Sequence, residues 1–461
     1  MTPAGRRLKQ IALFVGLLGA VSCGCQAQRR AKTECPTPTA LGLNVRDIID
    51  KPQQEEVESL IDLKELGVEA DKYRKEAVKT AEEKRNPAAP PWKQKNILCL
   101  SGGGSYGAFT AGVLCGWTAK GKSKGERPPF DVVTGISTGA LIAPFAFLGS
   151  AYDDQMKAFY TTNESKDLYK VRPIRGFFGE ALADNSKLAA KVDCALSPQV
   201  MAELAEAHRK GRRLYIGTTE AESKRFVIWD IGAIAVKGRP EDRLVIKQIL
   251  LASSAIPGFF PPQHITLDLE GECITEKHLD GGVSQAIFMR GPYLPPEHRS
   301  LNGNHDLAGH NLYCIVAGKL YIDPQPLPKF SVAIAAQEVS AVIYAQTRGD
   351  LQRMANITML TGMNFYMTSI PIEYPAPATS TAFEIPALVG MFNEGYRIMI
   401  EDKVWRKGPP NRAPGENANE RAGTSLTYKQ RGPYVPPGPR NRPYLPFTLS
   451  EDGIPMLPPM K

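Results

Sequence analysis

The chain has 461 residues, which is enough for one large domain with extensions or for two ordinary domains, and its 43% hydrophobic content supports a buried core. Its 56 basic and 48 acidic residues leave a formal net charge of only +8. This mild excess argues against a nucleic-acid-binding surface and would allow weak attraction to anionic membranes.

The N-terminus has the pattern of an export signal. Three basic residues precede the apolar run Ile11–Val21, which is followed by small residues and Cys23. The run is shorter than the roughly 20 apolar residues that span a bilayer. The stretch AVSC resembles a bacterial lipobox, so we expect residues 1–27 to be a signal peptide and Cys23 to become the lipid anchor of a periplasm-facing membrane lipoprotein. Cleavage after Ala27, giving a soluble secreted protein, is the alternative.

The eight cysteines predict neither a metal site nor a disulfide framework. No pair has metal-ligand spacing, and Cys99 and Cys115 lie in apolar segments, where a free thiol behaves as a small hydrophobic group. An export route would permit disulfides, but the scattered positions indicate no pairing.

The composition divides the chain into segments. Residues 28–93 are rich in charge, and the sparse apolar residues between Gln53 and Arg85 have helical spacing, so we expect an exposed helical segment and linker. Residues 407–461 hold twelve of the 38 prolines and are predicted to form a disordered or extended tail. The main domain is predicted to occupy residues 94–406, between these two segments.

Within residues 94–406, segments typical of strands alternate with segments typical of helices, which predicts a mainly parallel sheet covered by helices. Strands are predicted at residues 96–100, 130–135, 212–220, 225–230 and 311–318. Helices are predicted at residues 107–117, 138–149, 241–255 and 329–354.

The sequence SGGGSYGAFTAG, residues 101–112, is a glycine-rich loop between the first strand and the first helix. Gly102, Gly104 and Gly107 satisfy G-x-G-x-x-G, which is typical of dinucleotide sites. Such a site needs an acidic residue at the end of the next strand, but here Asp131 begins that strand and Ser137 follows it. The loop amides could instead stabilise a negatively charged oxygen during catalysis.

The sequence GISTG, Gly135 to Gly139, lies where the second strand turns into a helix. This motif holds its central serine in a strained turn, exposed above the sheet, and the flanking glycines leave room for the adjacent strand and helix. Ser137 is therefore a candidate nucleophile. The competing interpretation is an ordinary turn.

The sequence HLDGGV supplies a candidate base, Asp280, because a partly buried carboxylate can remove the proton of a serine hydroxyl. Asp-Gly-Gly by itself is also common in turns. None of the six histidines has surroundings typical of a catalytic base. A triad of Ser137, Asp280 and His310 nevertheless remains possible from chain order.

Four motifs, SGGGSYGAFTAG, GISTG, ASSAIPGFFPP and HLDGGV, occur in this order within about residues 96–284. Together they resemble the patatin-like phospholipases, and MFNEGYRIMIED is similar to the C-terminal end of that family's domain. The resemblance implies a three-layer α/β/α fold with a mainly parallel central sheet. It also implies a Ser-Asp dyad that needs no metal or organic cofactor.

Carried onto this chain, the resemblance makes Ser137 the nucleophile and Asp280 its base. The oxyanion hole would be formed by Gly102, Gly103 and Gly104. The glycines that support these motifs are Gly107, Gly135, Gly139, Gly281 and Gly282. Phe259 and Phe260 would line an acyl channel or, equally, be core aromatics beside a turn.

The chain departs from the family pattern at Ser101, where the family usually has Asp, and at Tyr106, where it has Arg or Lys. These positions bear on the rigidity of the loop and on head-group preference.

The sequence thus predicts an exported lipid acyl hydrolase of phospholipase A or lysophospholipase type, acting at a membrane surface on a lipid or lysolipid. The alternatives are a Ser-His-Asp esterase and a non-catalytic lipid-binding or scaffold protein on the same fold. No nucleic-acid partner is expected, and protein partners are not indicated.

Overall fold

The computed structural model describes residues 63–87, 93–124, 127–172, 179–269, 272–299, 306–322 and 331–410, with two short strands at 448–449 and 455–456. The predicted signal segment with Cys23 and most of the predicted tail lie outside the described residues. The chain divides into two compact units, residues 1–65 with 415–427 and residues 66–414 with 428–461. Apart from residues 63–65, which begin the first helix, the sheet and helices below belong to the second unit.

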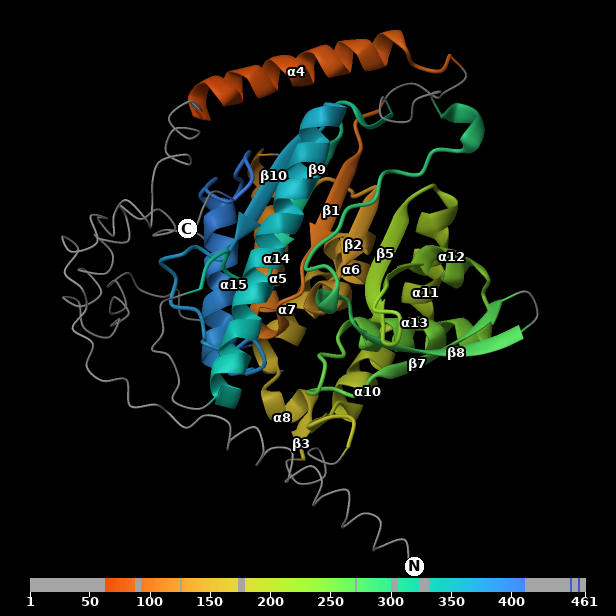
Figure 1. Ribbon diagram of the computed structural model, residues 1–461, viewed down its shortest axis with the longest axis vertical. Coiled ribbons are helices and arrows are strands. Elements are labelled where there is room, and N and C mark those ends of the chain that lie inside the picture. The colour runs from red at the N-terminus through yellow and green to blue at the C-terminus, as the bar shows by residue number, and fades with distance from the viewer. Residues whose placement is uncertain are drawn as a thin grey trace, which may run out of the picture. The chain divides into compact units, whose positions relative to one another are not determined.

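The centre of this unit is an eight-stranded sheet in the order β10-β9-β1-β2-β5-β8-β7, with β6 also paired to β5 (Figure 1). The five strands from β10 to β5 are parallel, whereas the pairings of β6, β7 and β8 are antiparallel. The strands are β1 (Asn96–Leu100), β2 (Val132–Gly135), β5 (Arg213–Glu220), β6 (Phe226–Asp230), β7 (Gln263–Leu269), β8 (Glu272–Asp280), β9 (Asn311–Val316) and β10 (Asn364–Ser369).

Helices cover both faces of the sheet and complete the predicted three-layer fold. The helices that the structure describes are α4 (Leu63–Glu83), α5 (Gly107–Lys124), α6 (Thr138–Leu148), α7 (Asp153–Thr162), α8 (Ser165–Leu168), α10 (Ser186–Ala195), α11 (Pro198–Arg209), α12 (Ile231–Val236), α13 (Pro240–Ser253), α14 (Ser331–Thr361) and α15 (Ile385–Ile400). Short hairpins are formed by β3 (Lys170–Val171) with β4 (Ala183–Asp184) and by β11 (Thr448–Leu449) with β12 (Pro455–Met456). Among the helices that the structure describes, none is long and apolar enough to cross a membrane.

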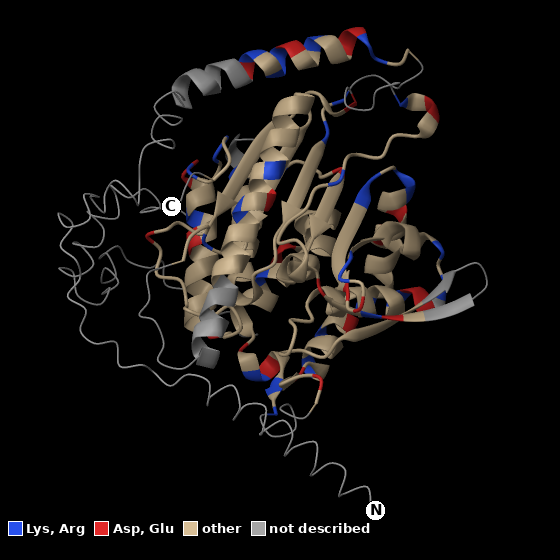
Figure 2. Ribbon diagram, in the orientation of Figure 1, with Lys and Arg blue, Asp and Glu red and all other residues tan. Residues whose placement is uncertain are grey.

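Alternate residues of each central strand enter different halves of the core, as the two-residue period of a strand requires. In β1, Leu98 and Leu100 pack with α5, α6, α13 and α15, whereas Ile97 and Cys99 pack toward α14. Both faces are apolar because both are covered by helices, which is typical of parallel sheets. Figure 2 shows few charged residues along the sheet and many on α4 and the outer loops.

The two edges of β5 determine where the site forms. β6 pairs with residues Tyr215 to Thr219 along one edge, so β2 and β8 share the other. Gly135 of β2 lies opposite Ile216, and Asp280 of β8 lies opposite Thr218. Ile216 and Thr218 are two residues apart on β5, which corresponds to about 7 Å along the strand. The carboxyl ends of β2 and β8 therefore meet end to end.

The five strands and four helices predicted within the main domain are confirmed, with end positions shifted by a few residues, and α4 confirms a helix within residues 53–85. The fold class is confirmed as well. The sequence analysis did not predict β7, β8 or β10. β10 and β7 are edge strands of the sheet, and β8 lies next to β7. β7 and β8 also carry charged residues within their alternating patterns, so they lack the continuous apolar run of a central strand.

Candidate active site

Ser137 occupies a strained turn between β2 and α6. Its φ of 53° and ψ of −123° lie in a region that residues other than glycine rarely adopt. The predicted steric reason for the flanking glycines is confirmed: a Cβ atom on Gly135 would lie 2.6 Å from the carbonyl oxygen of Gly139, and one on Gly139 would lie 2.6 Å from that of Leu100. Strand and helix can therefore approach closely enough to form the elbow.

Asp280 ends β8 beside this elbow and is buried, with 5% of its surface exposed. Gly282 N–H donates a hydrogen bond of 2.7 Å to Asp280 Oδ1. Burial raises the pKa of Asp280 to about 6, although the Ser137 hydroxyl and the Gly282 amide oppose this change. The Ser137 hydroxyl therefore lies within hydrogen-bonding reach of the Asp280 carboxylate.

The glycine loop lies against the serine. A Cβ atom on Gly102 would lie 3.1 Å from Ser137 Cβ, and one on Gly107 would overlap the hydroxyl of Thr138. Gly102 N–H donates to Ala286 O at 3.2 Å, so this amide is already bonded. The N–H groups of Gly103 and Gly104 donate to no acceptor in the part of the chain that the structure describes. Of the three predicted oxyanion glycines, these two have amides free to bind a substrate oxygen.

Two residues that depart from the family pattern anchor the loop. Ser101 Oγ accepts a 2.8 Å bond from Ala317 N–H and donates to Gly102 O. Tyr106 OH donates to Pro377 O. These bonds fix the loop at both ends, so the loop is held without the charged residues that the family usually carries there.

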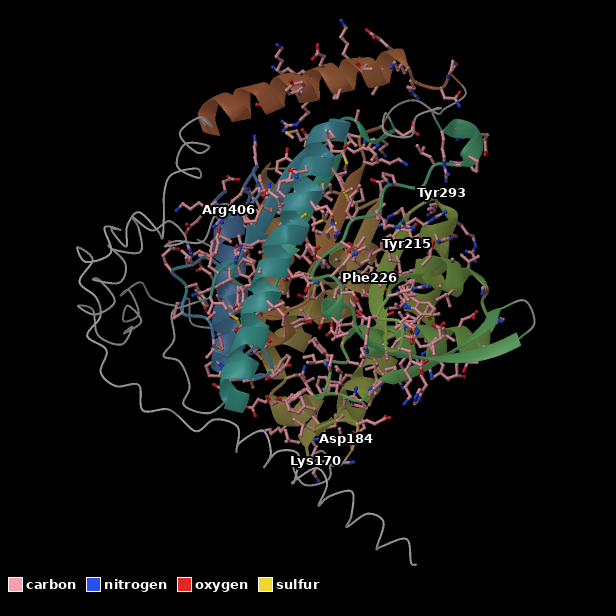
Figure 3. The ribbon with its side chains drawn as sticks, viewed as in Figure 1. Lys170, Asp184, Tyr215, Phe226, Tyr293 and Arg406 are labelled. Carbon is pink, nitrogen blue, oxygen red and sulfur yellow. The ribbon has the colours of Figure 1, made fainter. Side chains whose placement is uncertain are left out.

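An apolar hollow opens beside Ser137. Both predicted channel residues, Phe259 and Phe260, line it, and Tyr169 packs edge-on against the two rings. Figure 3 shows Lys170 and Asp184 of the neighbouring β3–β4 hairpin at the end of the unit opposite to Tyr293. The full lining is Gly104, Ser137, Thr138, Leu141, Phe159, Tyr160, Leu168, Tyr169, Leu188, Ser254, Ile256, Phe259, Phe260, Ser380, Thr381 and Phe383.

The sequence analysis missed the contributions of α6, α7 and α8 to this hollow. Leu141 lies one helical turn after Ser137, which caps the N-terminus of α6, so the helical period predicts that the two side chains lie near each other. The segment ending at Phe383 offered no comparable signal, because it reaches the site only through tertiary contacts. One of these is the 2.7 Å bond that Ser105 N–H donates to Ser380 O.

His310 does not complete the alternative triad with Ser137 and Asp280. His310 precedes β9, whereas Ser137 follows β2, so the parallel register separates them by about 20 Å along the strands. Burial lowers the pKa of His310 to about 4. His278 is buried and contacts Thr218 Oγ1 at 3.1 Å and Glu276 Oε2 at 3.1 Å. Lys95 N–H donates to His310 Nδ1 at 3.3 Å, so both histidines have hydrogen-bonding partners other than Ser137.

The residues around Ser137 offer little to a cofactor. Within the described parts of the chain, no cluster of three or more His, Cys, Asp or Glu side chains could hold a metal ion. The end of β2 carries Gly135 and Ser137, so it lacks the acidic residue that would bind the ribose of a dinucleotide. The arrangement is instead suited to acyl transfer.

Fold and site together define an α/β protein whose serine elbow meets a carboxylate at the carboxyl edge of the sheet. Residues 98–290 match the model of the patatin-like phospholipase family, so the chain contains a patatin-like phospholipase domain, which is typical of lipid acyl hydrolases. Among similar solved structures is VipD from Legionella pneumophila, with 12% identity, coverage of 68% of each chain and a TM-score of 0.27. No curated protein matches the chain.

Proposed function

We propose that this domain is a serine-dependent lipid acyl hydrolase of phospholipase A or lysophospholipase type. The observation that carries the proposal is that Ser137, whose hydroxyl hydrogen-bonds to the Asp280 carboxylate, lines an apolar hollow. A lipid ester has the matching chemistry, because its carbonyl can reach the serine while its acyl chain is removed from water.

In the first half of the reaction, Asp280 accepts the Ser137 proton while Ser137 Oγ attacks the ester carbonyl carbon. The amides of Gly103 and Gly104 donate hydrogen bonds to the oxygen that becomes negative, and one such donor is worth roughly 3 kcal/mol of barrier. The tetrahedral intermediate then collapses. The bond to the alcohol breaks, Asp280 returns its proton to the leaving oxygen, and an acyl ester remains on Ser137.

In the second half, Asp280 accepts a proton from water, and the resulting nucleophile attacks the acyl ester. The bond to Ser137 Oγ breaks, and the proton on Asp280 returns to the serine as the fatty acid leaves. The raised pKa of Asp280 makes its carboxylate a stronger base than an exposed one. Gly102 acts through its bond to Ala286, which holds the loop in place.

Variants of the full chain test this proposal on a panel of phospholipids and lysophospholipids. We expect Ser137→Ala and Asp280→Asn each to lower kcat/KM at least about 10³-fold. A fluorophosphonate probe should label the wild-type chain but not Ser137→Ala. His310→Ala is the matched control and should retain activity. Full activity of either dyad variant would refute the dyad, and a folded wild type that neither hydrolyses lipid nor takes the probe would favour a lipid-binding or scaffold role.

Export and membrane anchoring are a separate proposal, based on the N-terminal sequence alone. If the chain is a lipoprotein, mass spectrometry of the mature protein will find an acylated N-terminal Cys23. An unmodified N-terminus at Gln28 would instead indicate the soluble secreted form.

A further inference from the structure

The last residue of α13, Ser253, and the two residues after it contact the backbone on both sides of the candidate dyad. Ser253 is fully buried, and its Oγ accepts a 3.0 Å hydrogen bond from Ser137 N–H. The same hydroxyl donates a 2.7 Å bond to Gly217 O in β5. One side chain thus connects the nucleophile's amide to the central strand that lies between the two halves of the site.

The next two residues extend these contacts. Ser254 Oγ donates to Ser137 O at 3.3 Å, and Asp280 N–H donates to Ala255 O at 3.0 Å. Three consecutive residues therefore bind the amide of the nucleophile, its carbonyl and the amide of the base.

We propose that Ser253–Ala255 is a positioning segment that holds Ser137 in its strained conformation and sets it against Asp280, with Ser253 as the principal residue. This inference rests on the proposed function, because it assigns these residues to the same reaction. None of them is proposed to touch the substrate.

The energetics single out Ser253. Ser137 N–H has no acceptor other than Ser253 Oγ among the described residues, so removing this hydroxyl would leave a buried donor unpaired. Ser137 O, in contrast, also accepts bonds from Ala140 N–H at 2.9 Å and Leu141 N–H at 3.3 Å. Ser254 is therefore dispensable by comparison. Because the Ser137 amide is already bonded to Ser253, this amide is not available as an oxyanion donor.

Loss of the Ser253 bond would allow the strained turn to relax. A shift of about 1 Å in a catalytic group can lower a rate about 10²-fold. The effect should fall on kcat, since the apolar hollow that binds the acyl chain stays in place.

The test compares Ser253→Val with Ser253→Thr in the full chain. Valine and threonine have nearly the same shape, so any packing effect is common to both, whereas only threonine retains the hydroxyl. We expect Ser253→Val to lower kcat about 10²-fold with little change in KM, and Ser253→Thr to retain most of the wild-type kcat. Ser254→Ala should lower kcat less than about fivefold.

Hydrogen exchange at the Ser137 amide provides a readout that does not depend on activity. Exchange should accelerate in Ser253→Val and stay slow in Ser253→Thr. Equal kcat losses in the two variants, or faster exchange in Ser253→Val with unchanged kcat, would overturn the positioning role of Ser253. These outcomes would leave the proposed function in place. A wild-type chain without esterase activity would overturn the proposed function, and with it the role of Ser253 in that reaction.

Discussion

The candidate base should lower the stability of the fold at neutral pH, so replacing Asp280 by Asn should stabilise the protein while abolishing activity. Burial raises the pKa of Asp280 from its ordinary value of 3.8 to about 6. The folded state holds this proton more tightly than the unfolded state does. The contribution of Asp280 to the free energy of unfolding is therefore complete below pH 3.8 and is lost as the pH rises through 6. Above pH 6 the cost of the buried carboxylate is about 3 kcal/mol.

Urea unfolding of the wild type and Asp280→Asn between pH 4 and pH 8 measures this cost. The amide can still accept the Gly282 bond but carries no charge, so the variant should exceed the wild type by up to about 3 kcal/mol at pH 8. The advantage should shrink as the pH falls below 6. Asp280→Glu, which keeps the charge, should show no such gain. Equal stabilities at pH 8, or a difference that does not change with pH, would refute the assignment of a buried, ionised Asp280.

Three further predictions concern catalysis. Because Asp280 must be ionised to act as a base, kcat/KM for a p-nitrophenyl ester should rise about tenfold per pH unit up to about pH 6 and then level off; a midpoint near pH 4 would contradict this. Phe159, Leu141 and Tyr160 line both the hollow at Ser137 and a second apolar hollow, so they separate the two. Phe159→Ala should therefore shift substrate preference toward longer acyl chains in a series of C4 to C16 esters. An unchanged preference would show that these side chains do not limit chain length. Gly104→Ala should lower kcat about 10²- to 10³-fold, because φ is 53° and a Cβ atom would overlap Ser380 O; unaltered kcat would remove Gly104 from the oxyanion hole.

The sequence by itself determined the local elements of the site. A short apolar run between turn residues identifies β1 and β2, and the glycines of GISTG predict the elbow because their steric purpose involves only neighbouring strand and helix. The glycine loop could be recognised for the same reason. The sequence could not show which of the loop's three glycines has an amide free to bind the oxyanion. The Gly102 amide is bonded to Ala286 O, which lies far away in the chain.

Only the tertiary structure decided which residues meet. Asp280 reaches Ser137 because β8 pairs with the same edge of β5 as β2 does, and this register depends on the whole sheet. Ser253 shows the same limit. Its place in a recognisable motif is visible in the sequence, but its bond to the Ser137 amide is not. Local spacing encodes the conformation of a short segment, whereas hydrogen bonds between distant segments exist only once the strands have paired and the core has closed around them.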